Sequence, residues 1–116
     1  MALLAQLVDD VVVSKFDLKP GQLRIGRHPD NDVMIDDISV SGHHAIIEVV
    51  ESKYLEGTLE FFLVDKGSKN GTFINEKSVG SRERRVDGDV IRLAWNKFKL
   101  IDDGVKQLAS TAHVLQ

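Results

Sequence analysis

Three short polar segments of this chain contain the residue types that bind an anion. They are Gly26-Arg27, Ser41-Gly42 and Lys69-Asn70-Gly71. Arginine presents a planar fork of N–H donors that suits two oxygens of one anion, and a serine hydroxyl beside glycine backbone adds further donors. An asparagine amide carries both a donor and an acceptor, as is needed to hold an extended peptide backbone. The three segments therefore indicate an anion site built from loops.

Such loops need rigid elements at their bases, and the intervening sequence alternates apolar and polar residues with the period of β-strands. Turns are expected at Lys19-Pro20-Gly21 and Asp87-Gly88-Asp89. The charged segment 82–85 is predicted to be a solvated loop. About ten short strands indicate an all-β sandwich or barrel, with strands expected at 3–8, 11–16, 22–26, 33–35, 45–50, 59–65, 72–74, 90–95 and 97–101.

Length and composition exclude several classes of protein. The 116 residues form one domain, expected at 1–102, followed by a C-terminal tail or short helix at 103–116. There is no cysteine, hence no disulfide and no thiolate zinc site. The net charge of −3 argues against a sequence-independent nucleic-acid partner. With no signal peptide and no apolar run of about 20 residues, we expect a cytoplasmic protein without a membrane partner.

The polar segments occur in an order that resembles the forkhead-associated (FHA) domain family. The family motif runs Gly-Arg, Ser-Arg-x-His, Ser-x-Asn-Gly-Thr and a later Asn. This chain has Gly26-Arg27, Ser41-x-x-His44-Ala45, Asp65-x-x-Ser68-x-Asn70-Gly71-Thr72 and Asn75. The resemblance covers about residues 3–101. The Gly-Arg pair alone would be weak evidence for the family. All the motif segments in the same order, in a sequence with the pattern of β-strands, are specific evidence for it.

The resemblance implies an FHA-like (SMAD/FHA) β-sandwich of two twisted, mainly antiparallel sheets with about 10–11 strands, whose loops bind phosphothreonine peptides. It implies a binding module of Ser/Thr kinase signalling rather than an enzyme, with a phosphothreonine-containing protein or peptide, such as a kinase substrate, as the partner and no cofactor or metal. Carried over residue by residue, the phosphopeptide contacts would be Arg27, Ser41, Gly42, Lys69 and Asn70, and the structural support would come from Gly26, His44, Gly71 and Asn75.

One position departs from the family motif. Gly42 stands where the family usually has arginine, so one cation that faces the phosphate is missing. Either backbone N–H groups near Gly42 take its place, or His28 or His43 does, although histidine is largely neutral at pH 7. The alternative is a protein-interaction module of the same fold that does not require phosphate.

Other chemistry is less favoured by the sequence. Ser41 and His44 with an aspartate could be written as a catalytic triad, but the spacing has no specificity and a nucleophile elbow is absent. Metal binding by His28, His43 and His44 is not favoured. His43 and His44 are neighbours in the chain, and neighbouring strand residues point to opposite faces, so these two side chains cannot easily share one ion. Aspartates at 30, 32, 36 and 37 lack the spacing of a calcium loop and are interpreted as turn formers.

Overall fold

The computed structural model describes residues 2–80, 82–85 and 87–102. The predicted tail or helix at 103–116 lies outside these residues. In the described ranges there is no helix, and hence none long and apolar enough to cross a membrane. The strands are β1 (Ala2–Val8), β2 (Val11–Leu18), β3 (Gly21–Gly26), β4 (Val33–Met34), β5 (Ala45–Glu51), β6 (Leu59–Asp65), β7 (Thr72–Ile74), β8 (Lys77–Ser78), β9 (Arg82–Arg85), β10 (Val90–Leu93) and β11 (Asn96–Asp102).

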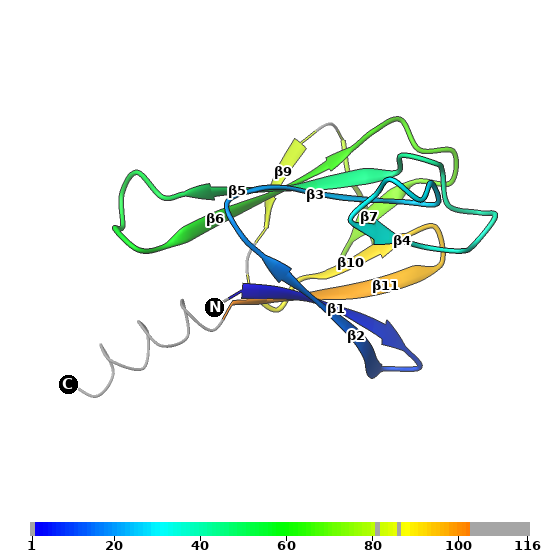
Figure 1. Cartoon of the computed structure of the whole chain (residues 1–116), viewed down its shortest axis with the longest axis horizontal. Coiled ribbons are helices and arrows are strands. Elements are labelled where there is room, and N and C mark those ends of the chain that lie inside the picture. The colour runs from blue at the N-terminus through cyan, green and yellow to red at the C-terminus, as the bar shows by residue number, and fades with distance from the viewer. Residues whose placement is uncertain (1, 81, 86, 103–116) are drawn as a thin grey trace.

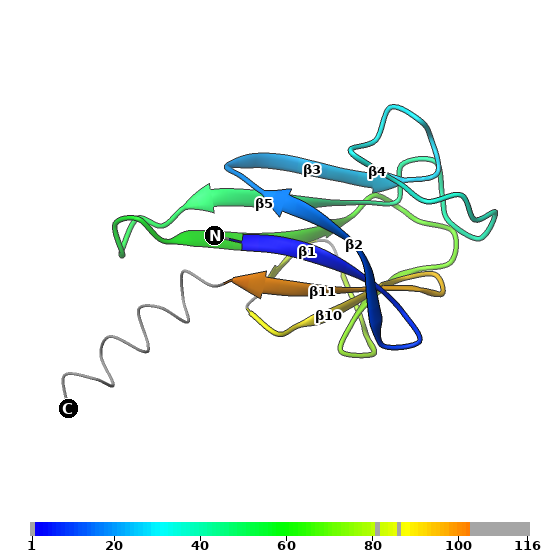
Figure 2. The ribbon, with the colours of Figure 1, turned by 60° about the horizontal axis from the view of Figure 1, so that its bottom comes forward.

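These strands form two sheets that face each other (Figures 1 and 2). The six-stranded sheet has the order β2-β1-β11-β10-β7-β8, and the five-stranded sheet has the order β4-β3-β5-β6-β9. All strand pairs are antiparallel except β3 and β4, which run parallel. The prediction of an all-β sandwich with two mainly antiparallel sheets is therefore confirmed.

The hydrophobic core lies between the two sheets and follows from the alternation in the sequence. In β5, Ala45, Ile47 and Val49 are buried, while the residues between them are half-buried. In β11, Phe98 and Leu100 are completely buried and alternate with exposed lysines. One face of each strand thus packs inward, as the period of two requires. This burial holds the strand ends, and hence the loops between them, in fixed positions.

Two strands were not predicted from the sequence. The segment 82–85, expected to be a solvated loop, is strand β9 at the edge of the five-stranded sheet, so that prediction is wrong. Its charges do not oppose pairing, because Arg82 contacts Glu48 at 2.6 Å and Arg84 contacts Glu60 at 3.4 Å across the sheet. Charged residues are common on edge strands, where they discourage pairing with other chains. The two-residue strand β8 is too short to produce a pattern.

The loops that contain the polar segments gather at one end of the sandwich. The β3–β4, β4–β5 and β6–β7 loops all lie on the right in Figure 1, opposite the β5–β6 hairpin. Backbone hydrogen bonds join them: the N–H of Arg27 donates to the carbonyl of Ser41 at 3.0 Å, and the N–H of His28 donates to that of Gly42 at 3.1 Å. The fold therefore brings together three segments that are separated by up to about 40 residues in the chain.

Candidate functional site

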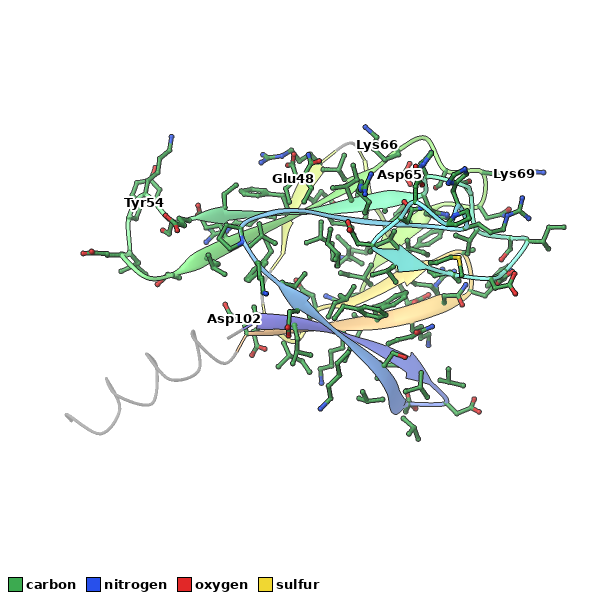
Figure 3. The ribbon with its side chains drawn as sticks, in the orientation of Figure 1. Glu48, Tyr54, Asp65, Lys66, Lys69 and Asp102 are labelled. Atoms are coloured by element: carbon green, nitrogen blue, oxygen red, sulfur yellow. The ribbon has the colours of Figure 1, made fainter. Side chains whose placement is uncertain are left out.

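A groove of about 260 Å³ lies among these loops. It is lined by residues of the β3–β4 loop (Arg27), the β4–β5 loop (Ile38, Ser39, Val40, Ser41, Gly42) and the β6–β7 loop (Lys69). Figure 3 shows the Lys69 side chain extending from the same end of the molecule. Four of the five expected phosphopeptide contacts thus line one groove, and the fifth, Asn70, is the next residue in the chain.

The cations of the groove are uncompensated in the described part of the chain. Neither Arg27 nor Lys69 has a carboxylate oxygen within 4.0 Å there. Other arginines are paired, for example Arg24 with Asp32 at 3.5 Å and Arg92 with Glu76 at 3.2 Å. Two unpaired cations beside a concave surface attract an anion.

The Ser41 hydroxyl is held in place by the β6–β7 loop. Its Oγ accepts a hydrogen bond from the backbone N–H of Lys69 at 2.9 Å. A hydroxyl has one O–H donor in addition to its acceptor lone pairs. The Ser41 hydrogen therefore stays available for an anion oxygen while the oxygen position is fixed.

The Asn70 amide is anchored across the loops. Its Nδ2 donates to the carbonyl oxygen of Ser39 at 2.7 Å. An amide has two N–H donors and a carbonyl oxygen, so this bond leaves it with further capacity. Asn70 thus joins the β6–β7 loop to the β4–β5 loop and still presents polar atoms at the rim of the groove.

His44 is completely buried and connects the loops from below. Its Nδ1 accepts the N–H of Ser41 at 3.1 Å, which places the ring proton on Nε2, and Nε2 donates to the carbonyl of Gly71 at 2.8 Å. Its backbone N–H also donates to Ile25 at 3.0 Å. One side chain therefore sets the spacing between the Ser41 loop and the Gly71 loop.

Gly26 and Asn31 fix the other wall of the groove. A Cβ at Gly26 would lie 2.2 Å from the carbonyl oxygen of Gly42, so only glycine allows this approach. Asn31 Nδ2 donates to the carbonyls of His28 at 2.8 Å and Gly42 at 2.7 Å. Asn31 was not predicted as a site residue, because its role depends on a contact with a residue 11 positions away in the chain.

Asp65, which opens the motif that continues with Ser68 and Asn70, organises the β6–β7 loop. Its carboxylate accepts hydrogen bonds from the Ser68 hydroxyl at 2.6 Å, the Thr72 hydroxyl at 2.7 Å and the backbone N–H groups of Gly67 and Ser68. Partial burial raises the pKa of Asp65, but the hydrogen bonds from Ser68, Thr72 and Gly67 together lower it below its ordinary value. An aspartate followed three residues later by serine is a signal for such a turn.

Gly71 and Asn75, the remaining two residues predicted to support the site, lie in different parts of the structure. Gly71 has a φ of 85°, in the left-handed region, and its carbonyl accepts both His44 Nε2 and the N–H of Ala94. Asn75 forms the β7–β8 turn with a φ of 48°, and its side chain bonds Asp89 and the N–H of Val90. Asn75 thus shapes the sheet next to the site, whereas Gly71 belongs to the loop cluster itself.

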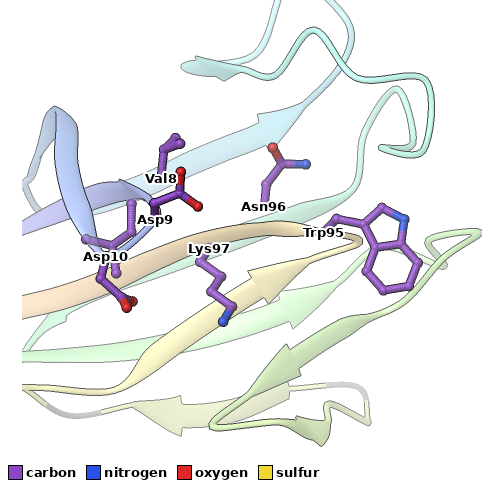
Figure 4. Close-up of a pocket in the computed structure, with 7 residues that line it drawn as sticks. Val8, Asp9, Asp10, Trp95, Asn96 and Lys97 are labelled. Atoms are coloured by element: carbon purple, nitrogen blue, oxygen red, sulfur yellow. The ribbon is translucent and has the colours of Figure 1, made fainter.

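A second, larger hollow of about 460 Å³ lies between the β1–β2 turn and the β10–β11 turn (Figure 4). Its lining includes Asp9, Asp10, Trp95, Asn96 and Lys97, and it shares no residue with the first groove. Two carboxylates repel an anion, so the smaller groove with Arg27 and Lys69 is the candidate anion site despite its size.

The model of the FHA domain family matches residues 23–94 of this chain. The chain belongs to the FHA domain family. It is 40% identical to the glycogen accumulation regulator GarA of Mycolicibacterium smegmatis over 76% of the chain and 49% of that protein. It is 37% identical to the oxoglutarate dehydrogenase inhibitor of Corynebacterium glutamicum over 66% of the chain and 46% of that protein. The chain thus spans about half the length of these relatives.

Solved structures give the same result. An FHA domain from a study of phosphothreonine-dependent interactions superposes with a TM-score of 0.71 at 30% identity, covering 87% of this chain and 95% of that one. EmbR of Mycobacterium tuberculosis, solved with a low-affinity phosphopeptide, matches with a TM-score of 0.71 at 30% identity over 86% of this chain and 24% of that one. The expected resemblance to the FHA family is therefore confirmed.

Proposed function

We propose that this chain is a phosphothreonine-dependent peptide-binding module. The observation that carries the proposal is the groove in which unpaired Arg27 and Lys69 lie with the Ser41 hydroxyl. A phosphothreonine brings close to two negative charges and three strong acceptor oxygens. Arg27 and Ser41 would hold the phosphate, Lys69 would add charge, and Asn70 would bind the peptide backbone.

In this proposal Gly42 contacts the phosphate through its backbone. Among the hydrogen bonds of the described residues, its backbone N–H has no acceptor, although Gly42 lines the groove. That N–H would donate to the phosphate in place of the arginine that the family motif carries. Ile38 and Val40 line the same groove and supply an apolar wall for the threonine methyl. One buried methyl is worth about 0.8 kcal/mol, or about fourfold over phosphoserine.

The domain boundaries and the cell context are part of the same proposal. Residues 1–102 would form the module, and 103–116 would be a tail or short helix. The relatives are named a regulator and an inhibitor, and proteins of that kind fit the expected role in cytoplasmic Ser/Thr kinase signalling. The partner would be a protein that such a kinase phosphorylates on threonine.

The test is a titration with a phosphothreonine peptide library, followed by affinity measurements on the peptide selected. Arg27→Ala and Ser41→Ala should each weaken binding by tenfold or more, since a hydrogen bond to a charged group contributes about 1.5–3 kcal/mol. Arg24→Ala is the matched control, because Arg24 is an exposed arginine of strand β3 that is already paired with Asp32 of the β3–β4 loop. Unchanged binding in both groove variants would refute the proposal.

A second candidate function rests on the departure at Gly42. A module of the same fold that ignores phosphate would bind a partner and its dephosphorylated form with equal affinity. The same titration, repeated with the unphosphorylated peptide, separates the two functions.

A further inference from the structure

Three side chains with metal-binding atoms converge beside the groove. His28 Nδ1 lies 2.7 Å from Asp30 Oδ1, and His43 Nε2 lies 3.1 Å from the same oxygen. The two imidazole rings are stacked with centroids 5.3 Å apart and planes at 28°. One ligand atom from each residue lies within 4.8 Å of the other two. The adjacency of His43 and His44 in the sequence disfavours a shared ion, but in the structure the partner of His43 is Asp30.

We propose that His28, Asp30 and His43 form a binding site for a divalent transition-metal ion of the zinc class, whose charge adds to the phosphate-binding field of the adjacent groove. The second half of this inference rests on the proposed function. Two imidazoles and one carboxylate are a donor set that suits Zn²⁺ and Ni²⁺, whereas Mg²⁺ and Ca²⁺ prefer oxygen ligands. The fourth coordination position would stay open to water.

The three ligand atoms lie within 4.8 Å of one another, so they can surround such an ion after the two imidazole rings turn. Ligand atoms about 2.0–2.1 Å from a tetrahedral zinc ion lie about 3.3 Å from one another. The two contacts to Asp30, at 2.7 and 3.1 Å, need only small changes to reach that spacing. The side chains of His28, Asp30 and His43 are 56%, 52% and 57% exposed, so the rings can turn without disturbing the core.

The two loops that supply the ligands are already fixed relative to each other. Asn31 Nδ2 bonds the carbonyls of both His28 and Gly42, and the N–H of His28 bonds Gly42 as well. The segments that carry the three ligands are therefore held close together by backbone and side-chain hydrogen bonds before an ion binds.

The groove lies next to this cluster through Gly42. Gly42 lines the groove, immediately precedes His43 in the chain, and accepts hydrogen bonds from His28 and Asn31. Gly42 is also the position where the family motif carries a cation. A metal ion held by its neighbours would restore positive charge at this edge. A divalent ion about 10 Å from a dianionic phosphate, at an ionic strength of about 0.1 M, would raise the affinity about threefold.

The first experiment is a calorimetric titration of the chelator-treated protein with ZnCl₂ alone, with MgCl₂ as a parallel control. We expect one zinc ion per chain and no heat of Mg²⁺ binding. His28→Ala, His43→Ala and Asp30→Asn should each weaken zinc binding by tenfold or more. Asp36→Asn is the matched control for the loss of one exposed aspartate, and His113→Ala controls for the fourth histidine of the chain. Neither control should change the zinc affinity.

A spectroscopic measurement on the unaltered protein does not depend on the folding of any variant. The imidazole NMR resonances of His28 and His43 should shift on addition of zinc, while those of buried His44 should not. Absence of zinc binding, or binding that is unchanged in both His28→Ala and His43→Ala, would overturn the metal site.

The link to the groove is tested separately with a phosphothreonine peptide. Zinc should raise peptide affinity about threefold in the unaltered protein and leave it unchanged in Asp30→Asn. Zinc binding without this gain would overturn the coupling and leave the metal site established. If no phosphopeptide binds with or without zinc, the proposed function and the coupling both fail, while the zinc titration alone still decides the metal site.

Discussion

Substitution of Gly42 by arginine tests whether the groove lacks one cation. A Cβ at Gly42 would have His28 Cβ, 4.0 Å away, as its nearest neighbour, which is an ordinary contact. Gly42 is also outside the left-handed region, so an arginine there needs no strained backbone. The change should therefore leave the fold intact, and it can stabilise it by about 0.4–1 kcal/mol by restricting the unfolded chain.

The magnitude follows from the charge and from the cost of ordering the side chain. Two unit charges about 4 Å apart attract by about 1 kcal/mol in bulk water and about 4 kcal/mol near a protein surface. Ordering an arginine side chain opposes this by up to about 2 kcal/mol. The net gain should be about 1–2 kcal/mol, which is a fivefold to thirtyfold tighter complex with a phosphothreonine peptide.

Fluorescence anisotropy with a labelled peptide, measured in a chelator, gives this ratio without any contribution from metal. Gly42→Gln is the matched control, because glutamine stiffens the backbone without adding charge. The gain should shrink as salt is raised, since exposed charges are screened, and it should vanish with the unphosphorylated peptide. No gain, or an equal gain with glutamine, would refute the inference that Gly42 marks a missing phosphate-facing cation.

Three further outcomes follow from the framework of the groove. Gly26→Ala should lower the free energy of unfolding by about 1–3 kcal/mol, because its Cβ would overlap the Gly42 carbonyl. Gly80→Ala, with open space around it, is the control in the same urea titration. His44→Ala should cost about 3–5 kcal/mol through a cavity and two lost hydrogen bonds, and a loss below about 1 kcal/mol would contradict its bridging role. The pKa of Asp65 is lower in the folded state than its unfolded value of about 3.9. Ionised Asp65 therefore stabilises the fold at pH values above about 3.9, and this stabilisation is lost as the pH falls through the pKa of the folded state. Unfolding measured between pH 7 and 2 should show this loss below about pH 4, and Asp65→Asn should reduce it.

The strands that bury one face were predictable from the sequence, and those at the edges were not. Leu59–Asp65 alternates buried and half-buried residues because both neighbours of β6 are strands and one face meets the core. Strand β9 contains three arginines and shows no alternation of apolar and polar residues. Its pairing with β6 is supported by contacts such as that of the Arg82 guanidinium with the Phe62 ring, 3.8 Å from the ring centroid. Those contacts join residues 20 apart in the chain, so no local pattern reports them.

The candidate site shows the same division. The ordered motif placed Arg27, Ser41 and Lys69 on loops, and the structure brings them to one groove. The residues that fix those loops, Asn31 and Asp65, act through carbonyls and hydroxyls on other segments or turns. Their residue types are ordinary for loops, so their specific roles became visible only when the distances were known.

The buried position of His44 has a consequence for how FHA domains of this type can diversify. The bases of the loops are fixed by His44 from inside the sandwich, whereas a tip such as Ile38, with 89% exposure, lies in solvent. Substitutions at the tips can alter which residues around a phosphothreonine are accepted while the anion contacts keep their positions. A combinatorial library confined to those tips would therefore yield modules with new sequence preferences on an unchanged scaffold.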